Sequence, residues 1–379
     1  MNLPEYKNLD TQHLQRLFDN MSECYKLFWF QAIVDAVAEG KEIISYDDLV
    51  NDMIANAWYM VSEYKLNLGP ADTLEALVHY AYKISGLKSS EKKEVIIETL
   101  KAIKDPELNK RKQILTYNVP YRLQAPFMSD FKGDAWKGPK AEVAKRINAY
   151  ANLIYRFHNI SGLDSKIQID PDWADYIRRN YEIILGWLQY NTILYLQRRN
   201  PSVPGIPNKL YPPQERKLER VKSFWKVIVD VAPVRDIYGN IQMEKNNLSI
   251  DHFVPWSYVA HDELWNLNPT TRSVNSSKSN HLPEWDLYFA PLCNLEYQAY
   301  ELIWSCDAVH REFDKCAKEH LNNADIRRRL YRQGLSKAEF TTNLEEVVRP
   351  VYQAAQNIGF DNWRLRDNIG CNYITIDKR

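Results

Sequence analysis

Cysteine and long apolar runs are both scarce in this 379-residue chain, and each shortage excludes a class of protein. The five cysteines are Cys24, Cys293, Cys306, Cys316 and Cys371. No two of them have Cys-x-x-Cys spacing, which argues against a thiolate-bound zinc site, and they fit a reducing compartment. No apolar stretch approaches the roughly 20 residues that span a bilayer, and the start, MNLPEYKNLD, has no basic and apolar signal sequence. We therefore expect a cytoplasmic protein without membrane contact.

An excess of charge of either sign is also missing, because 49 basic residues balance 49 acidic ones. Any binding to a polyanion must therefore come from local patches and not from the total charge. Hydrophobic residues make up 45% of the chain and aromatic residues 12%, which is enough to fill sizeable cores at this length. The sequence predicts a globular protein of two or three domains.

Most of the chain has apolar residues at helical spacing. The pattern begins at Asp10 and continues to Glu39, which fits one long helix or two, until Gly40 ends it. Ser45 opens a second helix that continues to about Glu63. Further helical patterns cover residues 72–86, 89–104, 141–158 and 172–199, and the region from Pro283 to about Asn357. Prolines at 120, 126 and 139 with glycines at 133 and 138 predict an extended linker, and Tyr238-Gly239-Asn240 predicts a turn.

These patterns predict five regions along the chain. They are an N-terminal helical region (1–115), an extended linker (116–140), a helical region with a basic helix (141–235), a small polar finger (236–300) and a C-terminal helical region (301–379). We see no internal repeat and no low-complexity segment.

The stretch LSIDHFVPWSYVAHDELWNLNPTTRSVNSSKSNHLP, residues 248–283, is unusually rich in polar residues at fixed offsets. Asp251-His252 is followed after fourteen positions by Asn266-Leu267, after nine more by Asn275, and after three more by Lys278. This ladder resembles the HNH (His-Me finger, ββα-metal) nuclease motif, and specifically the variant with Asn in place of the final His, as in the HNH domain of CRISPR effector nucleases. The expected fold is therefore mainly α-helical with an inserted ββα-metal finger.

Many HNH proteins carry Cys-x-x-Cys pairs around the second strand, and Thr271 and Val274 occupy the positions of one such pair here. The resemblance therefore implies a finger with no structural zinc. Apolar side chains must stabilise it instead, and those available are Phe253, Trp256, Tyr258, Leu264, Trp265 and Leu282.

The resemblance also implies a role for each residue of the ladder. Asp251 and Asn275 would each give one oxygen to a divalent cation, and such hard ligands favour Mg²⁺ first and Mn²⁺ second. His252 would be the general base that takes a proton from water. Asn266 would hold the loop backbone and so orient His252, and Lys278 would reach the same phosphate.

Basic residues near the finger are candidates for binding nucleic acid. The best set lies on a helix from Gln214 to Val231 and comprises Arg216, Lys217, Arg220 and Lys222, and Arg272 is a further candidate. A second set is Arg327, Arg328, Arg329 and Arg332. The alternative for each set is a solvated helix face, which is the usual role of charged runs. His261 is expected to hydrogen-bond within its loop, and His281 to cap a helix end.

The predicted function is a metal-dependent HNH endonuclease that hydrolyses phosphodiester bonds, with DNA favoured over RNA as substrate. The combination of a helical body with a zinc-free finger resembles nucleases of bacterial anti-phage systems, which suggests an effector of antiviral defence. Two alternatives stay open, namely a finger that binds nucleic acid without cutting it and a helical interaction subunit of a larger assembly. Expected partners are nucleic acid and a protein bound through the helical regions.

Overall fold

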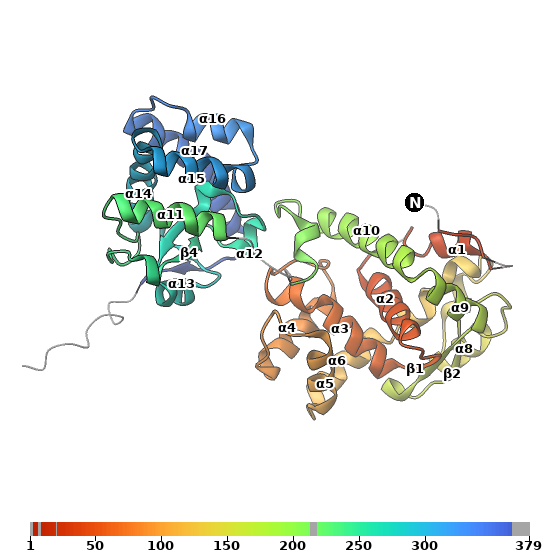
Figure 1. Cartoon of the computed structure of the whole chain (residues 1–379). Coiled ribbons are helices and arrows are strands. Elements are labelled where there is room, and N and C mark those ends of the chain that lie inside the picture. The colour runs from red at the N-terminus through yellow and green to blue at the C-terminus, as the bar shows by residue number, and fades with distance from the viewer. Residues whose placement is uncertain (1–2, 7–8, 20, 213–217, 366–379) are drawn as a thin grey trace, which may run out of the picture. The chain divides into compact units, whose positions relative to one another are not determined.

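A computed structural model describes residues 3–6, 9–19, 21–212 and 218–365 of the chain (Figure 1). The chain divides into two compact units. Unit 1 comprises Met1–Pro201 and Ile206–Pro212, and unit 2 comprises Ser202–Gly205 and Pro213–Arg379. Helices predominate in both and the strands are short, so the predicted mainly α-helical fold is confirmed. Among the described residues, no helix combines the length and the apolar character needed to cross a bilayer.

Unit 1 is a helical body with one small sheet. Its helices are α1 (Thr11–Gln15), α2 (Tyr25–Ala38), α3 (Tyr46–Ser62), α4 (Thr73–Ser85), α5 (Lys93–Ala102), α6 (Pro106–Leu115), α7 (Val119–Arg122), α8 (Lys140–Ile147), α9 (Pro171–Arg179) and α10 (Tyr181–Arg199). Its strands are β1 (Ile43–Ser45), β2 (Tyr155–Asn159) and β3 (Lys166–Ile169), and its 3₁₀ turns are η1 (Ala125–Phe127), η2 (Gly133–Trp136), η3 (Gly162–Asp164) and η4 (Ile206–Lys209).

Helix α2 lies at the centre of unit 1 and contacts α3, α9 and α10. Buried side chains cover most of its circumference from Leu27 to Val37, which is typical of a helix that is packed on all sides. The starts of α3 and α4 follow the sequence signals. Ser45 and Asp72 accept hydrogen bonds from backbone N–H groups of the first turns that they cap.

The segment 116–140 differs from the extended linker that its prolines and glycines predict. It contains α7, η1 and η2, and several of its apolar side chains, such as Tyr121 and Phe131, are buried. Pro120 and Pro126 stand in the first turns of α7 and η1. Proline is tolerated there because those positions need no N–H donor. The segment is therefore part of the folded body of unit 1.

The helix predicted over 141–158 is wrong in its second half, because α8 ends at Ile147 and residues 155–159 form β2. The Asn148 side chain ends the helix by bonding both the N–H (2.9 Å) and the carbonyl (2.7 Å) of Phe157. Such local side-chain bonds compete with the helical ladder. β2 then joins an antiparallel sheet in the order β1-β3-β2. The pattern over 172–199 is likewise interrupted at Asn180, between α9 and α10.

Unit 2 contains the finger and the helices around it. Its helices are α11 (Glu219–Val231), α12 (Trp256–Val259), α13 (Arg272–Lys278), α14 (Trp285–Ser305), α15 (Asp307–His320), α16 (Ala324–Tyr331) and α17 (Lys337–Asn357). Its strands are β4 (Ser249–His252), β5 (Leu267–Thr270), β6 (Leu282–Pro283) and β7 (Asn362–Trp363), with 3₁₀ turns η5 (Lys245–Asn247) and η6 (Leu264–Asn266). The last of these helices, α17, ends at Asn357, where the helical pattern of the sequence also ends.

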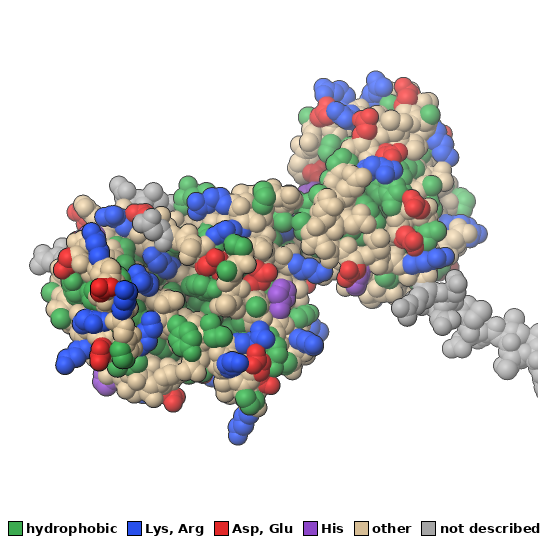
Figure 2. All heavy atoms as spheres, turned by 180° about the vertical axis from the view of Figure 1, so that it is seen from behind, with side chains coloured by type: hydrophobic (Ala, Val, Ile, Leu, Met, Phe, Trp, Pro, Cys, Tyr) green, Lys and Arg blue, Asp and Glu red, His purple; other side chains and the backbone are tan. Residues whose placement is uncertain are grey.

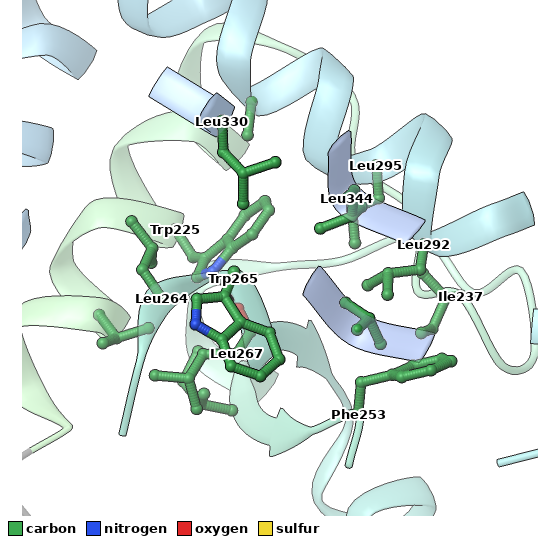
Figure 3. Close-up of a cluster of buried hydrophobic side chains, with 14 of the residues drawn as sticks. Trp225, Ile237, Phe253, Leu264, Trp265, Leu267, Leu292, Leu295, Leu330 and Leu344 are labelled. Carbon is green, nitrogen blue, oxygen red and sulfur yellow. Dashed lines mark hydrogen bonds between the residues drawn. The ribbon is translucent and has the colours of Figure 1, made fainter. Parts of the chain in front are cut away.

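The finger shares one hydrophobic core with the helices of unit 2, as Figure 3 shows. Trp225 of α11 is fully buried and donates its indole N–H to the carbonyl of Leu267 at 3.1 Å, which connects α11 to β5. Leu292 and Leu344 come to the same cluster from α14 and α17. All six apolar side chains that the sequence offers for holding the finger are buried: Phe253, Trp256, Tyr258, Leu264, Trp265 and Leu282.

The surface carries charges of both signs. On the face in Figure 2, Lys and Arg side chains are interspersed with Asp and Glu side chains, as the balanced composition implies. The Arg327–Arg332 cluster illustrates this mixing, because its arginines pair with nearby carboxylates. The pairs are Arg327–Asp314, Arg328–Asp325, Arg329–Asp325, Arg329–Glu346 and Arg332–Glu339. These pairs favour the solvated-face alternative for that cluster.

Candidate active site

The polar ladder folds into two antiparallel strands followed by a helix, β4, β5 and α13 (Figure 1). In the register of the two strands, Asp251 lies opposite Asn268 and His252 lies opposite Leu267. Thr271 caps α13 by accepting a hydrogen bond from the N–H of Val274, so the helix begins directly after β5. This short connection brings the end of β4 and the residues of α13 together.

Asp251 is buried, with 3% of its surface exposed, and both of its carboxylate oxygens accept hydrogen bonds. The Tyr238 hydroxyl donates to Oδ2 at 2.5 Å, and the Lys278 ammonium donates to Oδ1 at 3.2 Å. Burial raises the pKa of Tyr238 well above its usual range, and the Asp251 charge adds to this effect. The hydroxyl therefore stays protonated and serves as a donor to the carboxylate.

Lys278 lies inside the finger rather than on its surface. Its side chain is 0% exposed, and its ammonium also donates to the carbonyl of His252 at 2.6 Å. Burial lowers the pKa of Lys278, while the Asp251 carboxylate acts in the opposite direction. This position differs from the phosphate contact that the sequence predicts, because the four-carbon stem packs inward and directs the charge to the end of β4. The Lys278 carbonyl accepts a hydrogen bond from Nδ1 of His281 at 2.9 Å, at the C-terminal end of α13.

The imidazole of His252 is held by a carboxylate that the sequence reasoning missed. Its Nε2 lies 2.7 Å from Oδ1 of Asp262, and the residue is 5% exposed. With a carboxylate as acceptor, Nε2 carries the proton and Nδ1 has the lone pair. The Asp262 carbonyl bonds Nδ1 of His320 at 2.8 Å, which ties this loop to the end of α15. Asp262 lies ten residues after His252 in a loop, so spacing gave no signal for it.

Asn266 fixes the loop that follows His252. Its side-chain oxygen accepts from the N–H of Val254 at 2.7 Å, and its Nδ2 donates to the Val254 carbonyl at 2.8 Å. The Asn266 carbonyl also accepts from the N–H of Phe253 at 2.9 Å. These bonds give the backbone contact that the sequence leads one to expect of Asn266, and they fix the chain direction directly after the histidine.

Asn275 is anchored on β4, next to Asp251. Its Nδ2 donates to Oγ of Ser249 and to the carbonyl of Ile250, both at 2.9 Å. Both N–H groups of the amide therefore donate to β4, and the amide oxygen takes no part in these two hydrogen bonds. The amide oxygen is therefore the ligand atom that Asn275 could offer to a cation.

Asn268 is a second polar residue that the motif did not identify. Residues directly opposite each other in a sheet share a face, so its amide lies on the side of Asp251. The amide is near the Tyr238 hydroxyl, yet neither of its polar atoms makes a hydrogen bond of good geometry within the described residues. A buried amide without partners costs free energy, so this face of the strand pair fits a polar guest such as water or a hydrated ion.

Among residues 3–365 that the structure describes, no three His, Cys, Asp or Glu side chains are placed to hold a metal ion together. The oxygen donors of Asp251 and Asn275, with the nearby Asn268 amide, suit a hard cation that keeps part of its water shell. This donor set fits Mg²⁺ or Mn²⁺.

The nucleic-acid candidates are spread over the surface of unit 2. Arg272 is exposed at the first position of α13. Arg220 and Lys222 lie on α11 and are paired with Glu319 (3.4 Å) and Glu219 (2.8 Å). Arg216 and Lys217 fall outside the described residues.

Two antiparallel strands and a following helix, with Asp-His at the end of the first strand, define a ββα nuclease finger. Residues 236–284 match the model of a family described as HNH endonuclease, so this segment is an HNH endonuclease domain and the predicted resemblance to HNH nucleases in general is confirmed. This domain indicates a nuclease that acts on nucleic acid, and HNH nucleases typically use divalent metal ions. No curated protein and no solved structure matches the chain significantly.

Proposed function

We propose that this protein is a metal-dependent endonuclease that hydrolyses phosphodiester bonds, with DNA preferred over RNA. The observation that carries the proposal is the placement of Asp251, His252 and Asn275 around the end of β4, each held by bonds to its own support. Pre-positioned groups lower a reaction barrier because they need no reorganisation during the reaction.

Asp251 and Asn275 are the residues that would hold a divalent ion, Mg²⁺ or Mn²⁺. Such an ion neutralises charge on the phosphate and on the leaving oxygen. The residues fit it, because Asn275 keeps its amide oxygen out of its bonds to β4 and the buried Asn268 amide makes no hydrogen bond of good geometry with the described residues. The Lys278 ammonium already forms an ion pair with Asp251 and offsets its negative charge. We therefore expect Asp251 and Asn275 to hold such an ion only weakly without substrate.

His252 is the proposed general base. Because Nε2–H donates its hydrogen bond to Asp262, Nδ1 has the lone pair that would take a proton from the attacking water. The Asp262 carboxylate also stabilises the imidazolium that forms in this step, as second carboxylates do for catalytic histidines elsewhere. Asn266 and Lys278 act as positioning residues, since Lys278 bonds the carbonyl of His252, Asn266 bonds the backbone of Val254, and neither needs to touch the substrate.

The alternative of a finger that binds nucleic acid without cutting also has an observation in its favour. Asp251 is buried and both of its oxygens are already bonded, so a metal must share it with Lys278. A carboxylate has about four lone-pair sites, which allows such sharing. The complete set of base, orienting carboxylate and oxygen ligands makes the cutting enzyme the better supported function.

The biological setting that we propose is a cytoplasmic effector of anti-phage defence, with a protein partner bound through the helical regions. The resemblance of a helical body with a zinc-free finger to nucleases of such systems supports this setting.

The direct test incubates purified protein with labelled single-stranded and duplex DNA and RNA, with Mg²⁺ and separately with EDTA. We expect cleavage of at least one DNA substrate with Mg²⁺ and none with EDTA. Binding without cleavage of any of the four substrates would favour the non-cutting alternative.

A further inference from the structure

Unit 1 contains a lysine-lined cleft that the proposed nuclease site does not use. Its volume is about 970 Å³, and it is lined by the end of α5, the following turn, one face of α6, and residues 161–164 around η3. Its charged lining consists of four lysines, Lys101, Lys104, Lys110 and Lys112, and two aspartates, Asp47 and Asp164. The lining therefore carries more positive than negative charge.

The sequence of α6 places a polar face on this cleft. Asn109, Lys110 and Gln113 all line it, and their spacing along the chain puts them on one side of the helix. Lys110 is a donor only, and the amides of Asn109 and Gln113 add N–H donors beside their acceptor oxygens. With the lysine charge, this face can donate several hydrogen bonds to an anion with several oxygens.

Lys112 is a buried cation at the inner wall of the cleft. It is 2% exposed, and its ammonium makes two long contacts, 3.2 Å to Oδ1 of Asp47 and 3.5 Å to the carbonyl of Leu100. The other Asp47 oxygen accepts from Asn51 at 2.9 Å. An ammonium has three donors, and within the described residues the third has no acceptor. Burying a charge with incomplete bonding costs free energy, and an anion in the cleft would complete that bonding.

The lysines at the rim are incompletely neutralised. Lys101 pairs with Asp48 at 2.6 Å, whereas Lys104 and Lys110 take part in no ion pair among the described residues. Both are exposed. This contrasts with the Arg327–Arg332 cluster of unit 2, in which arginine charges are matched by carboxylates.

We infer that this cleft of unit 1 binds phosphate groups. Lysines bind phosphate as point charges, and amide side chains add directed hydrogen bonds. The volume lies near the upper end of the range for small-molecule sites, about 300–1,000 Å³, which leaves room for more than one phosphate. The phosphates come either from the backbone of the nucleic acid that unit 2 cuts or from a free nucleotide. The first source rests on the proposed nuclease function and the second does not.

The test uses full-length protein with His252→Ala, so that substrate is not consumed during binding measurements. In that host, Lys104→Glu with Lys110→Glu reverses the two unpaired charges at the rim. The matched control is Lys83→Glu with Lys92→Glu, two exposed lysines of unit 1 outside the cleft. Anisotropy of labelled single-stranded and duplex DNA of about 20 nucleotides, at several salt concentrations, measures the strand source, and calorimetry with ATP measures the nucleotide source.

If the strand is the source, we expect the cleft variant to bind DNA at least about tenfold more weakly, with the salt slope reduced by about 0.7–0.9 for each phosphate that the cleft no longer binds. The control should change by less than about twofold. A loss confined to ATP binding would support the same cleft with a free nucleotide as its ligand. Unchanged binding of both ligands, or binding of neither by the host protein, would overturn the inference. Cleavage by the otherwise wild-type enzyme is measured separately, so failure of the nuclease proposal is distinguishable from failure of this one.

Discussion

The two units of this protein use buried polar side chains differently. Unit 2 gathers Asp251, His252, Asn268 and Lys278 inside one small finger, and three of them bond to other side chains there. Unit 1 has an aromatic and aliphatic core around α2, and one of its buried lysines, Lys112, lies at the wall of an open cleft. Buried charge is costly unless it is paired. Buried charges that gather in the closed cluster of the finger therefore indicate catalysis. A buried charge beside the open cleft of unit 1 indicates ligand binding.

The largest expected effect is a difference in stability between substitutions of two buried lysines, Lys278 of unit 2 and Lys112 of unit 1. Lys278→Met removes the cation next to a buried carboxylate, which should destabilise the finger by about 3–5 kcal/mol. Lys112→Met should cost less than about 1–2 kcal/mol, because its contacts are long and Asp47 is one-third exposed. Hydrogen exchange of the β4 and α13 amides, compared with those of α6, measures each cost locally. Equal effects of the two substitutions would contradict the distinction between the units.

Two substitutions of Asn275 test whether its side chain is a metal ligand or only a packing residue. Asn275→Leu keeps the bulk but offers no ligand, so cleavage should fall by at least about 100-fold with every metal. Asn275→His keeps a ligand on the same helix, and should retain some cleavage while preferring Mn²⁺, Co²⁺ or Ni²⁺ over Mg²⁺. Initial cleavage rates across a series of divalent metals measure both. A Leu variant that cuts as well as the wild type with Mg²⁺ would show that Asn275 is no ligand.

Asp262 tests whether the loop carboxylate positions His252. Asp262→Asn keeps an oxygen acceptor for Nε2 and should lower kcat by about tenfold, whereas Asp262→Ala should lower it by about 100-fold, with KM little changed in both. The ¹⁵N NMR signals of His252 should show the Nε2–H tautomer in the wild type and a tautomer mixture in the Ala variant. If the tautomer and kcat are the same in all three proteins, Asp262 has only a structural role.

The smallest effect is expected on α11. Arg220 and Lys222 are paired with glutamates on the surface, so Arg220→Glu with Lys222→Glu should weaken nucleic-acid binding only about two- to fivefold. Anisotropy with labelled DNA measures the loss, with Arg328→Glu as the control on a paired cluster. A salt slope that is unchanged by the α11 substitutions would return this helix to the solvated-face interpretation.

The sequence predicted the finger far better than it predicted unit 1. The spacing of residue types in the sequence identified Asp251, His252, Asn266 and Asn275. It could do so because residues at a fixed spacing in regular strands and helices lie at fixed positions relative to one another. Asp262 stayed hidden, since it reaches His252 from a loop whose path depends on His320 of α15. Lys278 was found, but its direction was not, because motif spacing does not tell whether a long side chain packs inward.

In unit 1, the capping residues Ser45 and Asp72 predicted two helix starts, whereas local chemistry misled elsewhere. Pro120 and Pro126 signalled an extended linker but start short helices. The helix α8 ends early because Asn148 bonds the backbone of Phe157, a residue nine positions away that only the folded chain brings near. Such tertiary contacts override local propensity.

The central claim is that the finger of unit 2 carries out the chemistry with His252 as its base. The most direct test is the single-turnover cleavage rate at saturating nucleic acid with Mg²⁺, in the wild type, in His252→Ala and in His310→Ala, whose histidine lies on the surface of α15 paired with Asp314. We expect His252→Ala to lose about 10²–10⁴-fold in rate while it still binds nucleic acid, and His310→Ala to match the wild type. Cleavage by folded His252→Ala at the wild-type rate would contradict the account.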